Sequence, residues 1–263
     1  MNGEKIDMAE GMRKGIYILP NLFTTGSLFA GFYGIVATTN GRFEVAALWI
    51  LVSSIFDGLD GKVARLTGTS SKFGVEYDSL ADLVAFGVAP GILMYSWALK
   101  PFGRLGWLAA FLFVVCGALR LARFNVQVNT VESKRFVGLP IPAAASMVSA
   151  TVLLFHHFGW PGSYKKLAIL VLIYLLAFLM VSNFRYYSFK DPGLIRRQPF
   201  VFLVLAILLL IVIAAEPVVM LFLLFICYIF SGPMGYIMTY PRRRRLEKAL
   251  RKGHKSDAAK NGA

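Results

Sequence analysis

The strongest constraint on this chain is its series of long apolar stretches. Eight of them recur along the 263 residues, and most approach the roughly 20 residues that a helix needs to cross a hydrocarbon core about 30 Å thick. Hydrophobic residues make up 57% of the chain and charged residues 16%, which leaves too little polar surface for a water-soluble globule. The sequence therefore predicts an all-α, polytopic membrane protein. The eight expected spans cover residues 16–38, 43–65, 74–98, 104–124, 139–158, 164–183, 199–214 and 217–238.

The basic residues are unevenly divided between the two sides of the membrane. An even number of spans places both termini on one side, and only five of the 28 basic residues fall on the other, at Arg42, Lys100, Arg104, Lys165 and Lys166. The positive-inside rule then predicts cytoplasmic termini in a plasma (inner) membrane. This topology accounts for the net charge of +14 without a nucleic acid. We interpret the run Arg242–Arg245 as an anchor that contacts lipid headgroups.

Histidine and cysteine offer little chemistry in this sequence. Cys116 and Cys227 each lie inside an apolar run, which excludes a disulfide framework and a CxxC zinc site. His156 and His157 end the fifth expected span and are interpreted as interfacial polar residues. Residues 1–15 are expected to form a short interfacial helix rather than a cleaved signal peptide.

Acidic residues gather in one part of the chain. Five of the 14 acids fall between Asp57 and Asp82, where the second span ends and the third begins. Asp57 and Asp60 are three positions apart, and Asp78 and Asp82 are four apart, so each pair projects from one face of a helix. Carboxylates near hydrocarbon are costly unless a cation or water offsets them. Oxygen ligands without nearby Cys or His favour Mg²⁺ or Mn²⁺.

Small residues surround these acids, namely Gly58, Gly61, Ala64 and Gly74. A glycine inside a helix reduces helix stability by about 1 kcal/mol relative to alanine, so these glycines are expected to have a structural or functional role. Close helix packing is one such reason, and a bulky ligand lying against the backbone is the other. Arg65 follows Asp57 by eight positions, about two helical turns, and lies on nearly the same face. Its guanidinium group either binds a phosphate or extends to the membrane–water interface. Together these residues describe a site for a pyrophosphate-bearing ligand better than a cation pore.

The order Asp57-x-x-Asp60-Gly61-x-x-Ala64-Arg65, eight residues, Gly74-x-x-x-Asp78-x-x-x-Asp82 resembles the signature of the CDP-alcohol phosphotransferase family. The resemblance implies transfer of a phosphatidyl group from a CDP-linked donor to an alcohol, with release of CMP. It implies a homodimer and two divalent metals, Mg²⁺ or Mn²⁺, on the four aspartates, with Asp82 also acting as base. Contacts to the donor CDP-diacylglycerol are expected from Asn21, Thr24, Gly61, Ala64, Arg65, Ser71 and Gly74.

Further segments resemble the phosphatidylserine synthase branch of that family, among them Phe73–Asp82, Gly117–Asn125 and Gly138–Pro142. This resemblance implies L-serine as the acceptor. Arg120, Arg123 and Asn125 are candidates for binding the serine carboxylate or the donor phosphate, and anchoring of the helix is the alternative. Glycerol 3-phosphate and inositol phosphate remain open as acceptors. A different functional class, a divalent-cation transporter, is also an alternative. The acidic residues of such a transporter would be expected near the middle of the membrane and within sequence repeats.

These expectations give the chain three parts. Residues 1–15 form an N-terminal cytoplasmic or interfacial segment, residues 16–238 a transmembrane catalytic domain, and residues 239–263 a basic cytoplasmic tail. Six spans are expected to form the family-like core, with the last two as an extension. The partners implied are the two substrates and the surrounding lipids.

Overall fold

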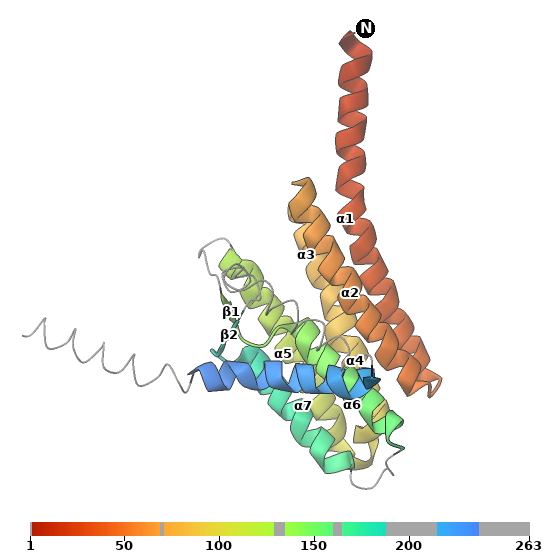
Figure 1. The fold of residues 1–263 in the computed structure, drawn as a ribbon, viewed down its shortest axis with the longest axis vertical. Helices are drawn as coiled ribbons and strands as arrows, with labels where there is room; N and C mark the ends of the chain where they lie inside the picture. Colours follow the sequence, from red (N-terminus) through yellow and green to blue (C-terminus); the bar gives the residue numbers. More distant parts are fainter. Residues whose placement is uncertain (1, 69–70, 129–134, 160–164, 188–214, 237–263) are drawn as a thin grey trace, which may run out of the picture.

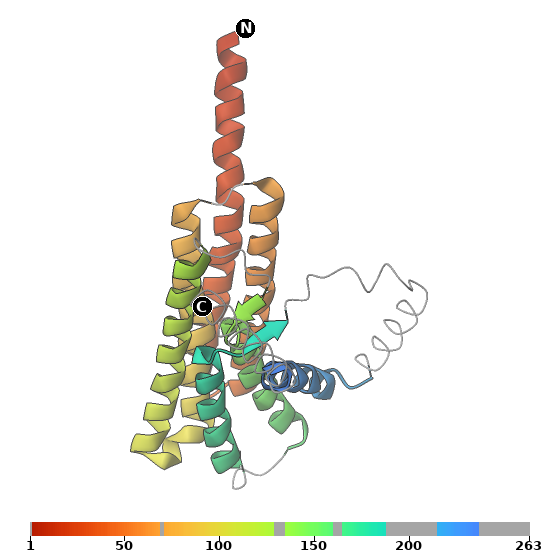
Figure 2. The same ribbon diagram turned by 90° about the vertical axis from the view of Figure 1, so that its left-hand side faces the viewer.

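The computed structural model describes residues 2–68, 71–128, 135–159, 165–187 and 215–236. Within these ranges the chain consists of helices, the short turns that connect them, and two strands of three residues each, β1 (Arg135–Val137) and β2 (Arg185–Tyr187). The helices form one elongated bundle, from which the N-terminal part of α1 projects (Figures 1 and 2). The expectation of an all-α membrane protein is confirmed.

The first two helices pack along each other. The first, α1 (Asn2–Thr39), is longer than the expected span because residues 2–15 continue the same helix instead of forming a separate interfacial one. Pro20 removes one backbone donor but does not end the helix. The second helix, α2 (Phe43–Thr67), ends at Gly68, whose φ of 64° is the left-handed conformation of a helix C-cap.

The third apolar segment is one continuous helical run that contains three irregular segments. It comprises α3 (Lys72–Asp82), α4 (Ala89–Met94), the π-helical segments η1 (Leu83–Val88) and η2 (Tyr95–Leu99), and a final 3₁₀ turn, η3 (Lys100–Phe102). Ser71 caps α3 by accepting a hydrogen bond from the backbone N–H of Gly74 at 2.9 Å. The first π-helical segment starts directly after Asp82, and such segments are frequent at functional sites.

The rest of the described bundle contains α5 (Arg104–Val128), α6 (Ile141–His157), α7 (Lys165–Val181) and a further helix, Pro217–Tyr236. Four helical segments are long and apolar enough to cross a membrane: Leu19–Thr39, Lys72–Phe102, Arg104–Val126 and Pro217–Tyr236. Two shorter apolar helices, Ile141–His157 and Leu167–Val181, match the fifth and sixth expected spans. The expected span 199–214 and the basic tail lie outside the described residues.

Close helix contacts hold the site-bearing elements together. Between α1 and α2, the hydroxyl groups of Ser27 and Ser53 are hydrogen-bonded at 2.8 Å. On another side of α1, a Cβ placed on Gly31 would lie 2.5 Å from the Cα of Ala85 in η1, so only glycine fits there. These contacts adjoin the apolar core, which includes the buried side chains of Ile50, Phe86 and Phe113. The helix that precedes the acids and the helix that carries Asp78 and Asp82 are therefore fixed against each other.

Candidate active site

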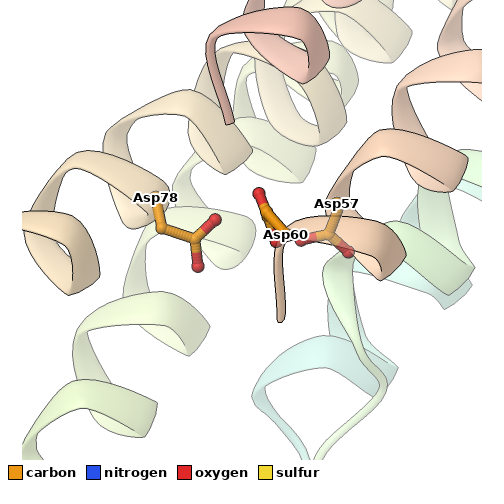
Figure 3. A group of neighbouring side chains, drawn as sticks. All are labelled: Asp57, Asp60 and Asp78. Carbon is orange, nitrogen blue, oxygen red and sulfur yellow. The ribbon is translucent and has the colours of Figure 1, made fainter. Parts of the chain in front are cut away.

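Three of the four predicted aspartates come together in space. Asp57 and Asp60 extend from α2 and Asp78 from α3, and one carboxylate oxygen of each lies within 4.8 Å of the others (Figure 3). The spacing of three residues keeps the α2 pair on one face, and the packing of both helices against α1 brings Asp78 opposite that face. The predicted convergence of the two helices is present in the structure.

Asp82 lies at the buried end of this group. Its side chain is 8% exposed, and its carboxyl group lies beside that of Asp57, close enough for a hydrogen bond between the two. Arg120 of α5 is equally buried, and it interacts electrostatically with both carboxylates. The guanidinium carbon of Arg120 lies 5.5 Å from the centre of the Phe124 ring. Asp82 is thus buried next to Asp57 and near a buried cation.

A cavity of about 170 Å³ opens beside the acids. Its wall includes Asp60 and Asp78, so two of the three clustered carboxylates face it. Six of the seven residues expected to contact the donor also line it: Asn21, Thr24, Gly61, Ala64, Ser71 and Gly74. Pro20 and Val75 complete the lining. The residues expected at the nucleotide therefore surround one space next to the acidic cluster.

The hydroxyl of Thr24 links the cavity to the cluster. Thr24 Oγ1 donates a hydrogen bond to Asp60 Oδ2 at 2.9 Å, and both side chains are buried. A Cβ on Gly74 would lie 3.2 Å from Ser71 Oγ and 3.3 Å from Asn21 Oδ1, so this wall is already tightly packed. Around Gly61, by contrast, a Cβ would meet no atom within 4 Å. Space for a ligand therefore remains beside α2 at Gly61.

Other predicted residues lie apart from the cavity. Arg65 is exposed at the end of α2 and is not part of the cavity lining. Arg123 donates hydrogen bonds to the carbonyl oxygen of Val181 at 3.3 Å and to Asn183 Oδ1 at 2.6 Å, which joins α5 to the end of α7. Asn125 donates to Ser79 Oγ on α3 at 2.9 Å. Among the three acceptor candidates, Arg120 is the one beside the acids.

Tyr228 was not anticipated from the sequence. It belongs to the helix Pro217–Tyr236, and its ring centroid lies 5.6 Å from that of the buried Tyr186. It lies 42 positions after Tyr186, inside an apolar run with no motif around it. No pattern in the sequence indicates this proximity.

The acidic cluster has the composition of a site for a hard divalent cation. Among the described residues, the ion pairs within 4.0 Å are His156–Glu44 and His157–Glu216, and both lie away from these acids. Three carboxylates within 4.8 Å repel one another strongly where water is scarce. Oxygen donors alone, with neither Cys nor His in the group, suit Mg²⁺ or Mn²⁺. The residues therefore fit the metal that the family resemblance implies.

The sequence of this chain matches a known protein family. The CDP-alcohol phosphatidyltransferase family model matches residues 17–231. A CDP-diacylglycerol--serine O-phosphatidyltransferase of Helicobacter pylori is 49% identical over 176 residues, which cover 66% of this chain and 74% of the relative. An archaetidylserine synthase of Methanothermobacter thermautotrophicus is 39% identical over 170 residues, 64% of this chain and 69% of the relative. The chain belongs to the CDP-alcohol phosphatidyltransferase family.

Proposed function

We propose that this protein transfers the phosphatidyl group of CDP-diacylglycerol to the hydroxyl of L-serine, giving phosphatidylserine and CMP. The observation that carries the proposal is the cluster of Asp57, Asp60 and Asp78 on the rim of the cavity that contains the predicted donor contacts. The choice of serine is supported by the names of the relatives and by the buried cation Arg120 beside the acids.

In this proposal the four aspartates hold two divalent cations, Mg²⁺ or Mn²⁺. When bound, such cations neutralise the donor pyrophosphate and stabilise the departing CMP. Thr24 restrains the Asp60 carboxylate through its hydrogen bond, while Asn21, Ser71 and the backbone at Gly61 and Gly74 form the wall for the nucleotide.

Asp82 is the proposed general base. It accepts the proton of the serine hydroxyl as the serine oxygen attacks the phosphorus of the phosphatidyl group and the bond from that phosphorus to CMP breaks. The Asp82 carboxyl is buried next to Asp57, and Asp82 does not line the cavity. Arg120 then takes the serine carboxylate. Arg123 and Asn125 support this region through their bonds to Asn183 and Ser79.

The wider setting follows from the same proposal. The donor has acyl chains in lipid and a water-soluble nucleotide, so the active site must lie near a membrane surface. The distribution of basic residues favours the cytoplasmic face of a plasma (inner) membrane. Residues 16–238 then form the catalytic domain. A homodimer rests on the family resemblance alone.

The deciding experiment is CMP release by the purified protein with CDP-diacylglycerol and Mn²⁺ in the presence of individual alcohols. We expect release with L-serine. Release with glycerol 3-phosphate or inositol phosphate but not with serine would move the activity to another acceptor. Flux of Mn²⁺ into proteoliposomes without any CMP would instead favour the transporter.

A further inference from the structure

The segment Gly138–Pro142 connects β1 to α6 and is tied to the end of α7. The backbone N–H of Gly138 donates to the carbonyl oxygen of Phe184 at 2.8 Å, and the backbone N–H of Leu139 donates to the carbonyl oxygen of Leu179 at 3.0 Å. The φ angle of Gly138 is 84°, a left-handed conformation that favours glycine. None of the five residues lines the donor cavity. The segment is therefore anchored to the bundle without taking part in donor binding.

Ile141 is the side chain that this segment inserts into the bundle. It is the first residue of α6, and it is fully buried. Pro140 precedes it and Pro142 follows it, so a proline ring restricts the backbone on each side. The backbone that carries the Ile141 side chain therefore has little freedom to move.

The end of the Ile141 side chain occupies the space beside two glycines on different helices. A Cβ placed on Gly117 of α5 would lie 2.6 Å from Ile141 Cδ1, which is too close for two carbon atoms. A Cβ placed on Gly87 of η1 would lie 3.8 Å from the same atom. Both glycines are buried. A single methyl group of α6 thus packs against η1 and against α5.

The two glycines are close in the sequence to the buried charged residues of the site. Asp82 precedes Gly87 by five residues in the continuous run of α3 and η1, and Arg120 follows Gly117 by three residues in α5. These spacings are about one helical turn. Asp82 and Arg120 are each 8% exposed. The contact of Ile141 with both helices therefore fixes their separation within about one turn of the proposed base and of the proposed carboxylate ligand.

We propose that Ile141 is a positioning residue that sets the distance between η1 and α5, and thereby the fit of the acceptor amino acid between Asp82 and Arg120. The hydroxyl of the acceptor must reach Asp82 while its carboxylate lies at Arg120. A displacement of about 1 Å costs up to about 100-fold in rate when two groups must act on one small molecule. This inference rests on the proposed function, because it takes Asp82 as the base and Arg120 as the ligand of the serine carboxylate.

The test is an exchange of size between positions 117 and 141, followed by CMP release from the full-length protein at saturating Mn²⁺. Gly117→Ala places a methyl group against Ile141 Cδ1 and should lower kcat/KM for L-serine by about 10- to 100-fold. Ile141→Val removes that atom, and Cγ1 of residue 141 would then lie 3.4 Å from the new methyl group. The double variant Gly117→Ala/Ile141→Val should therefore recover most of the wild-type value. The KM for CDP-diacylglycerol should stay unchanged, because neither residue lines the donor cavity.

A matched control separates positioning from a general loss of packing. Ile173→Val removes the same methyl group from a fully buried isoleucine of α7. We expect Ile141→Val and Ile173→Val to lower Tm similarly, and only Ile141→Val to raise the KM for L-serine. If Gly117→Ala does not fold, this pair of variants decides the question.

Three results would overturn the inference: no recovery in the double variant, the same serine kinetics in the two isoleucine variants, or an equal loss for both substrates. Failure of the proposed function is a different result, because the wild-type protein itself would then release no CMP with L-serine.

Discussion

Thr24 of α1 and Asp60 of α2, 36 positions apart in the sequence, are joined by a buried hydrogen bond of 2.9 Å. The bond connects the wall of the proposed nucleotide cavity to the acidic cluster. Thr24 therefore contributes to both parts of the site. Its hydroxyl restrains the Asp60 carboxylate, and its side chain lines the cavity beside the acidic cluster.

Thr24→Val is expected to weaken metal binding without unfolding the protein. Valine keeps the shape of threonine but removes the hydroxyl group that donates to Asp60, a loss of about 1–3 kcal/mol. The concentration of Mn²⁺ that gives half-maximal CMP release should rise about tenfold. Thr25→Val is the matched control, because Thr25 bonds to Tyr77 at 2.9 Å and does not line the cavity. An equal shift in both variants would argue against a specific role for Thr24.

Mn²⁺ should stabilise the metal-free protein. Relief of repulsion among Asp57, Asp60 and Asp78 favours the folded state, and a ligand at 100 times its Kd adds about 2.7 kcal/mol. Thermal unfolding of EDTA-treated protein, with and without added Mn²⁺, measures this stabilisation as a rise in Tm and does not depend on activity. Asp78→Asn should lose most of the Mn²⁺-dependent shift. Glu76→Gln, an exposed acid on the same helix, should retain it.

Asp82→Asn should reduce kcat by a factor on the order of 10² to 10⁴, because a general base contributes acceleration of that size. With Mn²⁺ at saturation, the KM for CDP-diacylglycerol should change less than kcat, since Asp82 does not line the donor cavity. CMP release measured at saturating serine checks the effect. Near-normal turnover in a folded Asp82→Asn protein would exclude Asp82 as the base.

Two glycines on α2 provide a matched pair for mapping the donor site. A Cβ on Gly58 or on Gly61 would meet no atom within 4 Å, but only Gly61 lines the cavity. Gly61→Leu should raise the KM for CDP-diacylglycerol by an order of magnitude or more, since its side chain fills space meant for the nucleotide. Gly58→Leu should leave that KM unchanged. If the two variants behave alike, the cavity is not the donor site.

Arg123→Ala should affect stability rather than acceptor binding. Its guanidinium joins α5 to Val181 and Asn183, so its removal should cost about 1–3 kcal/mol. Thermal unfolding should show the loss, while the KM for L-serine stays at the wild-type value. A large rise in the KM for L-serine would instead indicate that Arg123 binds the acceptor.

Local spacing in the sequence was sufficient to predict the acidic cluster. Aspartates three and four positions apart share a helix face, and the structure places Asp57, Asp60 and Asp78 together. The donor contacts were predicted from the resemblance to the family and not from spacing, and six of those seven residues line the cavity.

Contacts between helices that are far apart in the sequence could not be predicted in this way. Arg120 and Arg123 are three residues apart and look equivalent in sequence, yet one lies at the acids and the other at the end of α7. Tyr228 lies beside the buried Tyr186 only because the last helix docks on the bundle there. The continuation of α1 back to Asn2 also differs from the expected break near residue 15. The intervening residues carry no proline to enforce that break.

The contact between Gly31 and Ala85 has a mechanical consequence for the site. A single methyl group at position 31 would act as a wedge between the two backbones. Asn21 lies ten residues away along α1, a lever arm of about 15 Å at 1.5 Å per residue. A change that touches neither substrate would thus alter the width of the nucleotide cavity, and the dimensions of the binding space are set partly from deep within the membrane.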